Sequence, residues 1–215
     1  MENNKEILLI GAGGHCKVVI DSIKEKNEFN GISLIDPSMQ IGEAISGITV
    51  IGKDEDLQCL FNQGYKYAFI TVGSVGNTDI RKRLFKFLKK IGFSLPTIVD
   101  RSAKISPYTN IMEGAYIGRN AVVNSHTTIG SCAIINTGAI IEHDNVIGDF
   151  VHISPGAVLS GNVKIGNNTH IGANSTIINN VEIGSDTIVG IGSVVLKDIK
   201  SNSIAYGNPC VEVFK

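Results

Sequence analysis

The chain has 215 residues, of which 43 % are hydrophobic and 18 % charged, which is enough for one large domain or two modest ones with buried cores. Its 19 basic and 20 acidic side chains give a formal charge of −1, so no excess positive charge is available for binding nucleic acid or an anionic membrane. The longest early apolar stretch, residues 7–10, is too short for a signal peptide or a membrane span, which predicts a cytoplasmic protein without membrane insertion.

Up to about residue 95, apolar runs alternate with amphipathic runs, which is the pattern of strands separated by helices. We expect strands at 5–10, ending at 36, at 48–51 and at 67–72, and helices at 15–26, 55–62 and 78–91. This alternation predicts a small parallel α/β domain of the Rossmann-like kind over residues 1–95.

Past residue 95 a six-residue period replaces the helical one. From Val99 to Val195, every sixth residue is Ile, Val or Leu. The fourth residue after each of them is usually small or β-branched, with Asn145 and Ile199 as departures. An ordinary β-sandwich would not keep this phase for about a hundred residues, so the period predicts a β-solenoid with three short faces per coil over residues 96–215.

Repeats such as Ile117-Gly-Arg-Asn-Ala121 and Ile147-Gly-Asp-Phe-Val151 resemble the hexapeptide motif of the left-handed parallel β-helix acyltransferases. The left-handedness is implied by this resemblance alone. Four further segments together resemble the narrower PglD/NeuD family: GAGGHCKVV from residue 11, GSVGNTDIR from 73, INTGAIIEHD from 135 and YGNP from 206.

Members of that family acetylate sugars, either sialic acid or the 4-amino group of nucleotide-linked amino-deoxysugars. The resemblance therefore implies an acetyltransferase that uses acetyl-CoA and no metal and acts on a nucleotide-activated amino-sugar in surface glycan biosynthesis. It also implies a homotrimer with each active site between two solenoids. The first domain would bind the nucleotide-sugar, and the second would bind acetyl-CoA and carry the catalytic groups.

The segment at residues 11–14, Gly-Ala-Gly-Gly, closes the first expected strand and opens a helix, where backbone N–H groups favour a phosphate. As a dinucleotide fingerprint it is incomplete, because Cys16 occupies the third glycine position. Such a turn is about as often a plain strand-to-helix connection as a phosphate site. Asp36 ends the second strand, where similar folds place a carboxylate near ribose or base. The family resemblance assigns four of these positions to the nucleotide-sugar: Gly13, Gly14, His15 and Asp36.

Residues 136–152 gather polar side chains in an otherwise uniform solenoid. His143 lies two positions after Ile141, at a turn, where its ring can project outward, and a neutral imidazole can accept a proton near pH 7. An outward histidine is more often inert, but the sequence EHD around it matches the family's catalytic histidine followed by an acidic residue. An amine that attacks a thioester must lose a proton, so we expect His143 to act as general base and Asp144 to orient it.

The resemblance also implies an acetyl-CoA site. His152 would contact acetyl-CoA, and Gly161, Ala173 and Ile191 would add backbone and apolar contacts. Gly161 lies one coil above His143, where its backbone N–H would stabilise the oxyanion, and Asn136 joins the substrate-binding set. His170 lies one coil from His152, so the two rings should stack, but neither His170 nor His126 matches a known role.

The sequence bears on three other functions. O-acetylation of sialic acid or another sugar hydroxyl would use the same residues. A non-catalytic protein that binds sugar nucleotides is disfavoured by the intact segment Glu142-His143-Asp144. A zinc hydrolase of the γ-carbonic anhydrase class is disfavoured because the chain has no pair of histidines five residues apart. The residues do not distinguish UDP from GDP.

Overall fold

The computed structural model describes residues 5–213, which form two compact units. The first unit extends to Ser74 and resumes over Asp79–Ile98. The second consists of Val99 and the residues after it, together with the short segment Val75–Thr78. Within the described residues, no helix is both long and apolar enough to cross a membrane.

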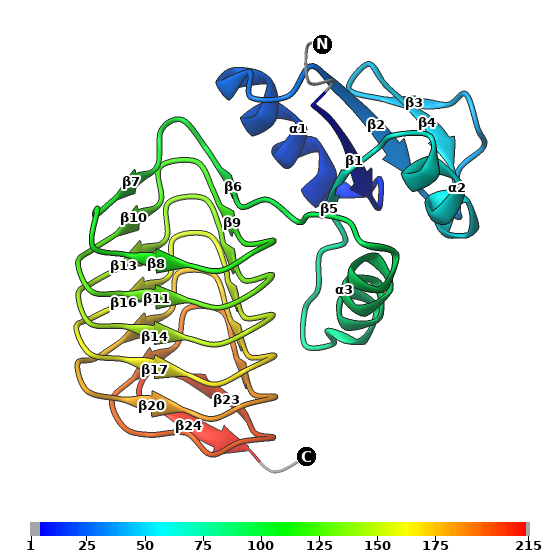
Figure 1. Ribbon diagram of the computed structural model, residues 1–215. Helices are drawn as coiled ribbons and strands as arrows, with labels where there is room; N and C mark the ends of the chain where they lie inside the picture. The colour runs from blue at the N-terminus through cyan, green and yellow to red at the C-terminus, as the bar shows by residue number, and fades with distance from the viewer. Residues whose placement is uncertain (1–4, 214–215) are drawn as a thin grey trace. The chain divides into compact units, whose positions relative to one another are not determined.

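The first unit is built on a five-stranded sheet with the order β3-β4-β2-β1-β5 (Figure 1). Its elements are β1 (Glu6–Ile10), α1 (Gly14–Lys26), β2 (Gly31–Ile35), β3 (Ala44–Ile45), β4 (Ile48–Gly52), a 3₁₀ turn (Asp54–Asp56), α2 (Leu57–Asn62), β5 (Tyr67–Ile70) and α3 (Asp79–Ile91). Strands β4, β2, β1 and β5 are parallel, whereas β3 pairs antiparallel with β4 at the edge. The chain crosses from one side of β1 to the other between β4 and β5, so the carboxyl end of β1 lies at the switch point where open α/β sheets bind ligands.

Gly11 shapes the turn between β1 and α1. Its φ is +103°, and a Cβ at this position would lie 2.6 Å from Val72 Cγ2. Glycine satisfies both constraints because it has no Cβ. The turn brings the first residues of α1 to the carboxyl end of the sheet.

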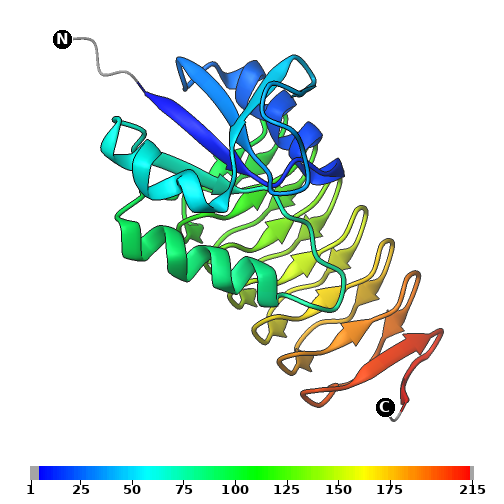
Figure 2. The same ribbon diagram turned by 90° about the vertical axis from the view of Figure 1, so that its right-hand side faces the viewer.

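The second unit is a parallel β-helix whose successive coils stack on one another and form three sheets (Figures 1 and 2). One sheet contains β6 (Ile98–Val99), β9 (Tyr116–Ile117), β12 (Ile134–Ile135), β15 (His152–Ile153), β18 (His170–Ile171), β21 (Ile188–Val189), β23 (Ile204–Gly207) and β24 (Cys210–Val213). The next contains β7 (Lys104–Ile105), β10 (Val122–Val123), β13 (Ile140–Ile141), β16 (Val158–Leu159), β19 (Thr176–Ile177) and β22 (Val194–Val195). The third contains β8 (Asn110–Ile111), β11 (Thr128–Ile129), β14 (Val146–Ile147), β17 (Lys164–Ile165) and β20 (Glu182–Ile183).

The aliphatic residues that recur every six positions form the core of this unit. Every periodic aliphatic residue from Ile117 to Val195 is at most 2 % exposed, and strands in successive coils pair in register 18 residues apart, as Val122 does with Ile140. The first three residues of the series, Val99, Ile105 and Ile111, are only partly buried. They lie in the first coil, which has a neighbouring coil on one side. The predicted fold class, an α/β unit followed by a hexapeptide-repeat β-helix, is confirmed.

From Gly114 to Gly192, each corner of the coils contains one residue in the left-handed conformation. At the corner between the β13 sheet and the β14 sheet these residues are His126, Asp144, Asn162 and Asn180, with φ between +56° and +64°. Asn and Asp tolerate this region better than other non-glycine residues. The conformation turns the chain sharply and leaves the residue before it, such as His143, on the outside of the corner.

Candidate active site

His143 and Asp144 form a directly bonded pair on the turn between β13 and β14. His143 Nδ1 lies 2.7 Å from Asp144 Oδ2. A carboxylate can only accept a hydrogen bond, so the pair places the imidazole proton on Nδ1 and leaves Nε2 with its lone pair. Both side chains are more than half exposed in the single chain, at 57 % and 54 %. The turn therefore presents a basic nitrogen to the outside of the corner.

The imidazole of His143 lies against Gly161, which occupies the equivalent position in the next coil. A Cβ on Gly161 would lie 2.6 Å from His143 Cε1 and 2.7 Å from His143 Nε2. Among residues 5–213, the backbone N–H of Gly161 has no hydrogen-bond acceptor. A backbone donor and the free imidazole nitrogen thus lie beside each other, as a site for acyl transfer requires.

The neighbouring Glu142 has a different role from His143. Its carboxylate Oε2 accepts a hydrogen bond of 3.0 Å from the side-chain amide of Asn124, one coil earlier. Its carbonyl oxygen accepts another, of 3.0 Å, from the hydroxyl of Thr127. Glu142 therefore links two coils, whereas the side chains of His143 and Asp144 point outward.

A pocket of about 360 Å³ lies along β15, β18 and β21 and is mostly apolar. It brings together three of the residues assigned to acetyl-CoA from the sequence: His152, Ala173 and Ile191. Gly161, the fourth, does not line this pocket and lies beside His143 instead. Ile191 is 79 % exposed, so its side chain forms part of the rim.

Asn136 and His152 are joined across adjacent coils. Asn136 Nδ2 lies 3.1 Å from His152 Nε2. The amide nitrogen is a donor, so Nε2 of His152 accepts and its proton is on Nδ1. The arrangement fixes the tautomer and the orientation of a histidine at the edge of the pocket.

His170 lines the same pocket, a role that the sequence had not indicated. Its ring packs edge-on against His152 with the centroids 4.9 Å apart, so the two histidines lie on neighbouring coils as expected but their rings are not stacked face to face. Its Nε2 lies 3.3 Å from the hydroxyl of Ser154. Burial lowers the pKa of His170 from its ordinary value of 6.5, so the ring favours the neutral form.

The segment Val75–Thr78 belongs to the same unit as the β-helix, and its first residue, Val75, lines this pocket. Thr78 Oγ1 donates a hydrogen bond of 3.1 Å to Asn168 Oδ1. Gly76 has a φ of +72°, and a Cβ there would lie 2.5 Å from the Ile188 side chain. These contacts hold Val75, which is 75 % exposed, at the pocket.

The predicted nucleotide-sugar residues lie at the switch point of the first unit. Helix α1 begins at Gly14 with no side-chain cap and no acidic residue in its first turn. A Cβ on Gly13 or Gly14 would meet no atom within 4 Å, so the space above the helix terminus is open. His15, next in the chain, is partly buried.

Asp36 follows β2, and its carboxylate accepts hydrogen bonds from the turns around it. One carboxylate oxygen accepts a hydrogen bond of 2.7 Å from the Ala12 N–H, and the other accepts bonds from the N–H and hydroxyl of Ser38. Burial acts to raise the pKa of Asp36, but these hydrogen bonds outweigh it and hold the pKa below its ordinary value of 3.8. The carboxylate is therefore charged and fixed beside the glycine turn.

Cys16, at the third glycine position of the motif, is buried. Desolvation raises the pKa of its thiol to about 11, although a hydrogen bond with Thr71 acts in the opposite direction. Because the thiol stays protonated near neutral pH, Cys16 acts as a small apolar side chain beneath the turn.

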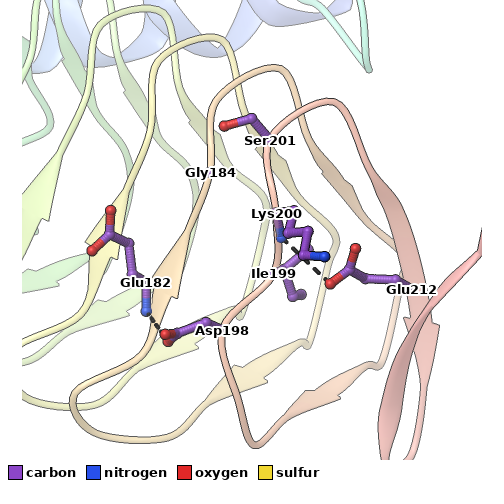
Figure 3. Close-up of a pocket in the computed structure, with 7 residues that line it drawn as sticks. All are labelled: Glu182, Gly184, Asp198, Ile199, Lys200, Ser201 and Glu212. Carbon is purple, nitrogen blue, oxygen red and sulfur yellow. Dashed lines mark hydrogen bonds between the residues drawn. The ribbon is translucent and has the colours of Figure 1, made fainter.

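A second hollow, of about 330 Å³, lies at the last coil of the β-helix and is lined mainly by polar and charged residues (Figure 3). Two carboxylates there accept hydrogen bonds from backbone N–H groups: Asp198 from Glu182, at 2.8 Å, and Glu212 from Lys200, at 3.4 Å. These bonds satisfy backbone groups where the sheet of β20 ends. None of the residues assigned from the sequence lines this hollow, which we interpret as the end cap of the solenoid.

Two family profiles match the chain. One, described as PglD N-terminal domain, covers residues 6–88, and the other, described as bacterial transferase hexapeptide (six repeats), covers residues 146–179 and 162–197. No curated protein sequence matches the chain significantly.

Several solved structures are similar over almost the full length. PerB from Caulobacter crescentus, in complex with CoA and GDP-perosamine, is 34 % identical over 97 % of this chain and 97 % of that one, with a TM-score of 0.91. A variant of perosamine N-acetyltransferase from the same organism is 33 % identical over 98 % and 97 %, with a TM-score of 0.92. The acetyltransferase domain of PglB from Neisseria gonorrhoeae, in complex with acetyl coenzyme A, is 32 % identical over 98 % and 100 %, with a TM-score of 0.91.

The similarity includes both units and reaches one third identity over nearly the whole of a perosamine N-acetyltransferase. The chain therefore belongs to the PglD/NeuD family of hexapeptide-repeat sugar acetyltransferases.

Proposed function

We propose that this protein transfers the acetyl group of acetyl-CoA to the amino group of a nucleotide-linked amino-dideoxysugar, with His143 as general base. The observation that carries the proposal is the geometry of the turn between β13 and β14. Asp144 Oδ2 accepts a hydrogen bond from His143 Nδ1 at an N···O distance of 2.7 Å, and the opposite ring nitrogen is free beside the backbone of Gly161.

His143 would remove the proton that the amine must lose as the C–N bond forms. The C–S bond of the thioester breaks in the same transfer, and the proton held on Nε2 can pass to the departing sulfur, so that the protons balance. Asp144 would keep the ring in the required tautomer and favour the imidazolium that forms. The N–H of Gly161 would donate to the negative charge that develops on the acyl oxygen.

The pocket along β15, β18 and β21 fits acetyl-CoA. Its lining is chiefly apolar. The side chains of Val75, Ile188 and Ile191 are suited to the long thin arm of CoA that carries the acyl group. His152, oriented by Asn136 at 3.1 Å, lines this pocket and would contact the bound molecule. Similar proteins were solved with CoA or acetyl-CoA.

The start of α1 fits the nucleotide portion of the acceptor. Open space at Gly13 and Gly14 lets a diphosphate approach the backbone N–H groups and the positive end of the helix. His15 directly follows this turn in the chain, and the fixed carboxylate of Asp36 is bonded to Ala12 within it, so both would contact the remainder of the nucleotide. The amino-sugar class is supported by the GDP-perosamine bound to PerB, which is 34 % identical.

The arrangement of one β-helix also supports the proposed homotrimer. The turn with His143 joins β13 to β14, whereas the pocket is lined by strands of the next sheet and by Ser154 and Pro155 beyond it. Base and pocket thus lie at different corners, and two β-helices packed side by side would bring one of each together. Ile140 and Val146, which flank the His143 turn, are 36 % and 49 % exposed and would be covered by a second chain.

Product analysis tests the proposed substrate class. The protein is incubated with acetyl-CoA and one acceptor at a time: GDP-perosamine, a UDP-linked 4-amino-4,6-dideoxysugar, or free sialic acid. We expect an N-acetylated nucleotide-sugar, identified by mass spectrometry and by its stability to mild base. Acetylation of sialic acid alone, on a hydroxyl, would replace the proposal by sugar O-acetylation.

A further inference from the structure

Asn145 interrupts the inward-facing pattern of the β-helix at the turn that carries His143. The equivalent positions in the coils on either side are occupied by Thr109, Thr127, Val163 and Val181. Asn145 is 0 % exposed, so its amide is wholly inside the coil. A buried amide must be hydrogen-bonded to avoid a large desolvation cost, and its partners therefore show what it stabilises.

The amide of Asn145 bridges two successive turns. Its Nδ2 donates to the carbonyl oxygen of Glu142 at 2.5 Å and to that of Ser160 at 3.0 Å. Its Oδ1 accepts a hydrogen bond of 3.1 Å from the N–H of Val163. One side chain thus binds the residue before His143 and both ends of the turn that contains Gly161.

Other inward hydroxyl residues make only part of this pattern. Thr169, at another corner, donates to the Gly184 carbonyl of the next coil at 2.7 Å and accepts from the Thr187 N–H at 3.3 Å. Those two bonds correspond to the bonds of Asn145 with Ser160 and Val163. Thr169 also donates within its own turn, to the Asn167 carbonyl at 3.4 Å, as Asn145 does to the His143 carbonyl at 3.4 Å. Compared with Thr169, Asn145 adds the bond to the Glu142 carbonyl, which braces the backbone at the base of His143.

We infer that Asn145 positions His143 against Gly161, by fixing the two turns that carry the proton acceptor and the backbone donor. The inference rests on the proposed function of His143 and adds a positioning residue to it. Asn145 touches no substrate, so its loss should lower the catalytic rate while substrate binding is retained. Displacement of a catalytic group by about 1 Å can cost about a hundredfold in rate.

Steady-state kinetics of Asn145→Val and Asn145→Thr test the inference, with acetyl-CoA and GDP-perosamine or the UDP-linked sugar as acceptor. Valine is the residue at positions 163 and 181, so the solenoid accommodates it, but it removes every bond of the amide. Threonine can restore the bonds to Ser160 and Val163 in the manner of Thr169. We expect kcat to fall about 10- to 100-fold in Asn145→Val, with KM for both substrates within about threefold of the wild type. Asn145→Thr should have an intermediate kcat.

Thr187→Val is the matched control. Thr187 is also 0 % exposed and joins two coils through a bond of 2.9 Å to the Lys200 carbonyl, at a corner without His143. It should lower the thermal midpoint but leave kcat unchanged. A kcat of Asn145→Val within about twofold of the wild type, or equal values for the Val and Thr variants, would overturn the inference.

Crystal structures of the wild type and of Asn145→Val give a second readout that needs no turnover. The inference predicts that the His143 ring leaves its place beside Gly161 in Asn145→Val and returns to it in Asn145→Thr. An undisplaced ring contradicts the inference whatever the enzyme's substrate. By contrast, a wild type that acetylates none of the acceptors, or a fully active His143→Ala, contradicts the proposed function and leaves this structural comparison to decide the role of Asn145.

Discussion

The imidazole of His143 occupies the space that a side chain on Gly161 would need. An ideal Cβ at Gly161 would lie 2.6 Å from Cε1 and 2.7 Å from Nε2 of the ring. Glycine at this position therefore lets the proposed base approach the backbone of the next coil. The same contact places Nε2, the nitrogen that would accept the proton, beside the backbone of Gly161.

Gly161→Ala should displace the His143 ring and lower kcat by about a hundredfold, because the added methyl group and the ring cannot occupy the same space. The thermal midpoint should fall as well. In the His143→Ala background the same Gly161→Ala change has no ring to meet, so its cost in the free energy of unfolding should be smaller. A double-mutant cycle of unfolding measures this coupling. Additive effects of the two changes would contradict the contact.

Gly13→Val should raise KM for the nucleotide-sugar without disturbing the fold. Gly13 has an extended backbone with φ of −79°, and a Cβ there would meet no atom within 4 Å. The valine side chain would instead fill the space above the start of α1 where we place the diphosphate. KM for acetyl-CoA is the internal control and should not change. Equal increases in both KM values would indicate a general loss of structure and contradict this placement.

Ile191→Asp should raise KM for acetyl-CoA about tenfold or more, since the apolar rim of the pocket would gain a charge that must be desolvated on binding. Ile41→Asp is the matched control, because Ile41 is also an exposed isoleucine, at 64 %, and does not line the pocket. Isothermal titration with acetyl-CoA measures both variants. Unchanged affinity in Ile191→Asp would place acetyl-CoA elsewhere.

The buried ring of His170 should make stability depend on pH. Burial lowers the pKa of His170 in the folded protein below its ordinary value of 6.5, so the unfolded chain binds the proton more readily. The resulting loss of stability begins as pH falls through about 6.5 and continues down to the folded pKa, with a slope of at most about 1.4 kcal/mol per pH unit for one proton.

Urea unfolding of the wild type and of His170→Gln between about pH 8 and about pH 5 measures this effect. The remaining histidines are common to both proteins, so the difference between the two curves isolates His170. The wild type should lose stability relative to the variant below about pH 6.5. Parallel curves over the whole range would contradict the burial of a neutral ring.

The fold could be predicted from the sequence because its signals are periodic. A side chain every six residues defined the coils, and the interval of eighteen residues placed His170 beside His152, as the structure confirms. Short elements lacked such a signal. Strand β3 has two residues, and it exists because Ser46 and Gly47, both at positive φ, turn the chain back onto β4. The helix expected at 55–62 begins instead with the 3₁₀ turn Asp54–Asp56.

The site was less accessible to sequence analysis, because several of its contacts join residues far apart in the chain. Asn145 stood out as a departure from the repeat, but its bonds to Ser160 and Val163 depend on the register of two coils. Val75 lies in the segment 73–81 that resembles the family, but that resemblance did not indicate a pocket, because the residue follows the last strand of the α/β unit and yet lines a pocket of the β-helix. The burial of His170 likewise appears only when the coils are stacked.

The release of free thiol from acetyl-CoA, in the presence of a nucleotide-linked 4-amino-4,6-dideoxysugar, tests the central claim most directly. The comparison is between the wild type, His143→Ala and the control His126→Ala, whose ring stacks on Tyr108 at 5.6 Å in the preceding coil. We predict sugar-dependent release by the wild type and by His126→Ala, and a loss of about 10²- to 10⁴-fold in His143→Ala with its fold intact. Sugar-dependent release by His143→Ala at the wild-type rate would contradict the account.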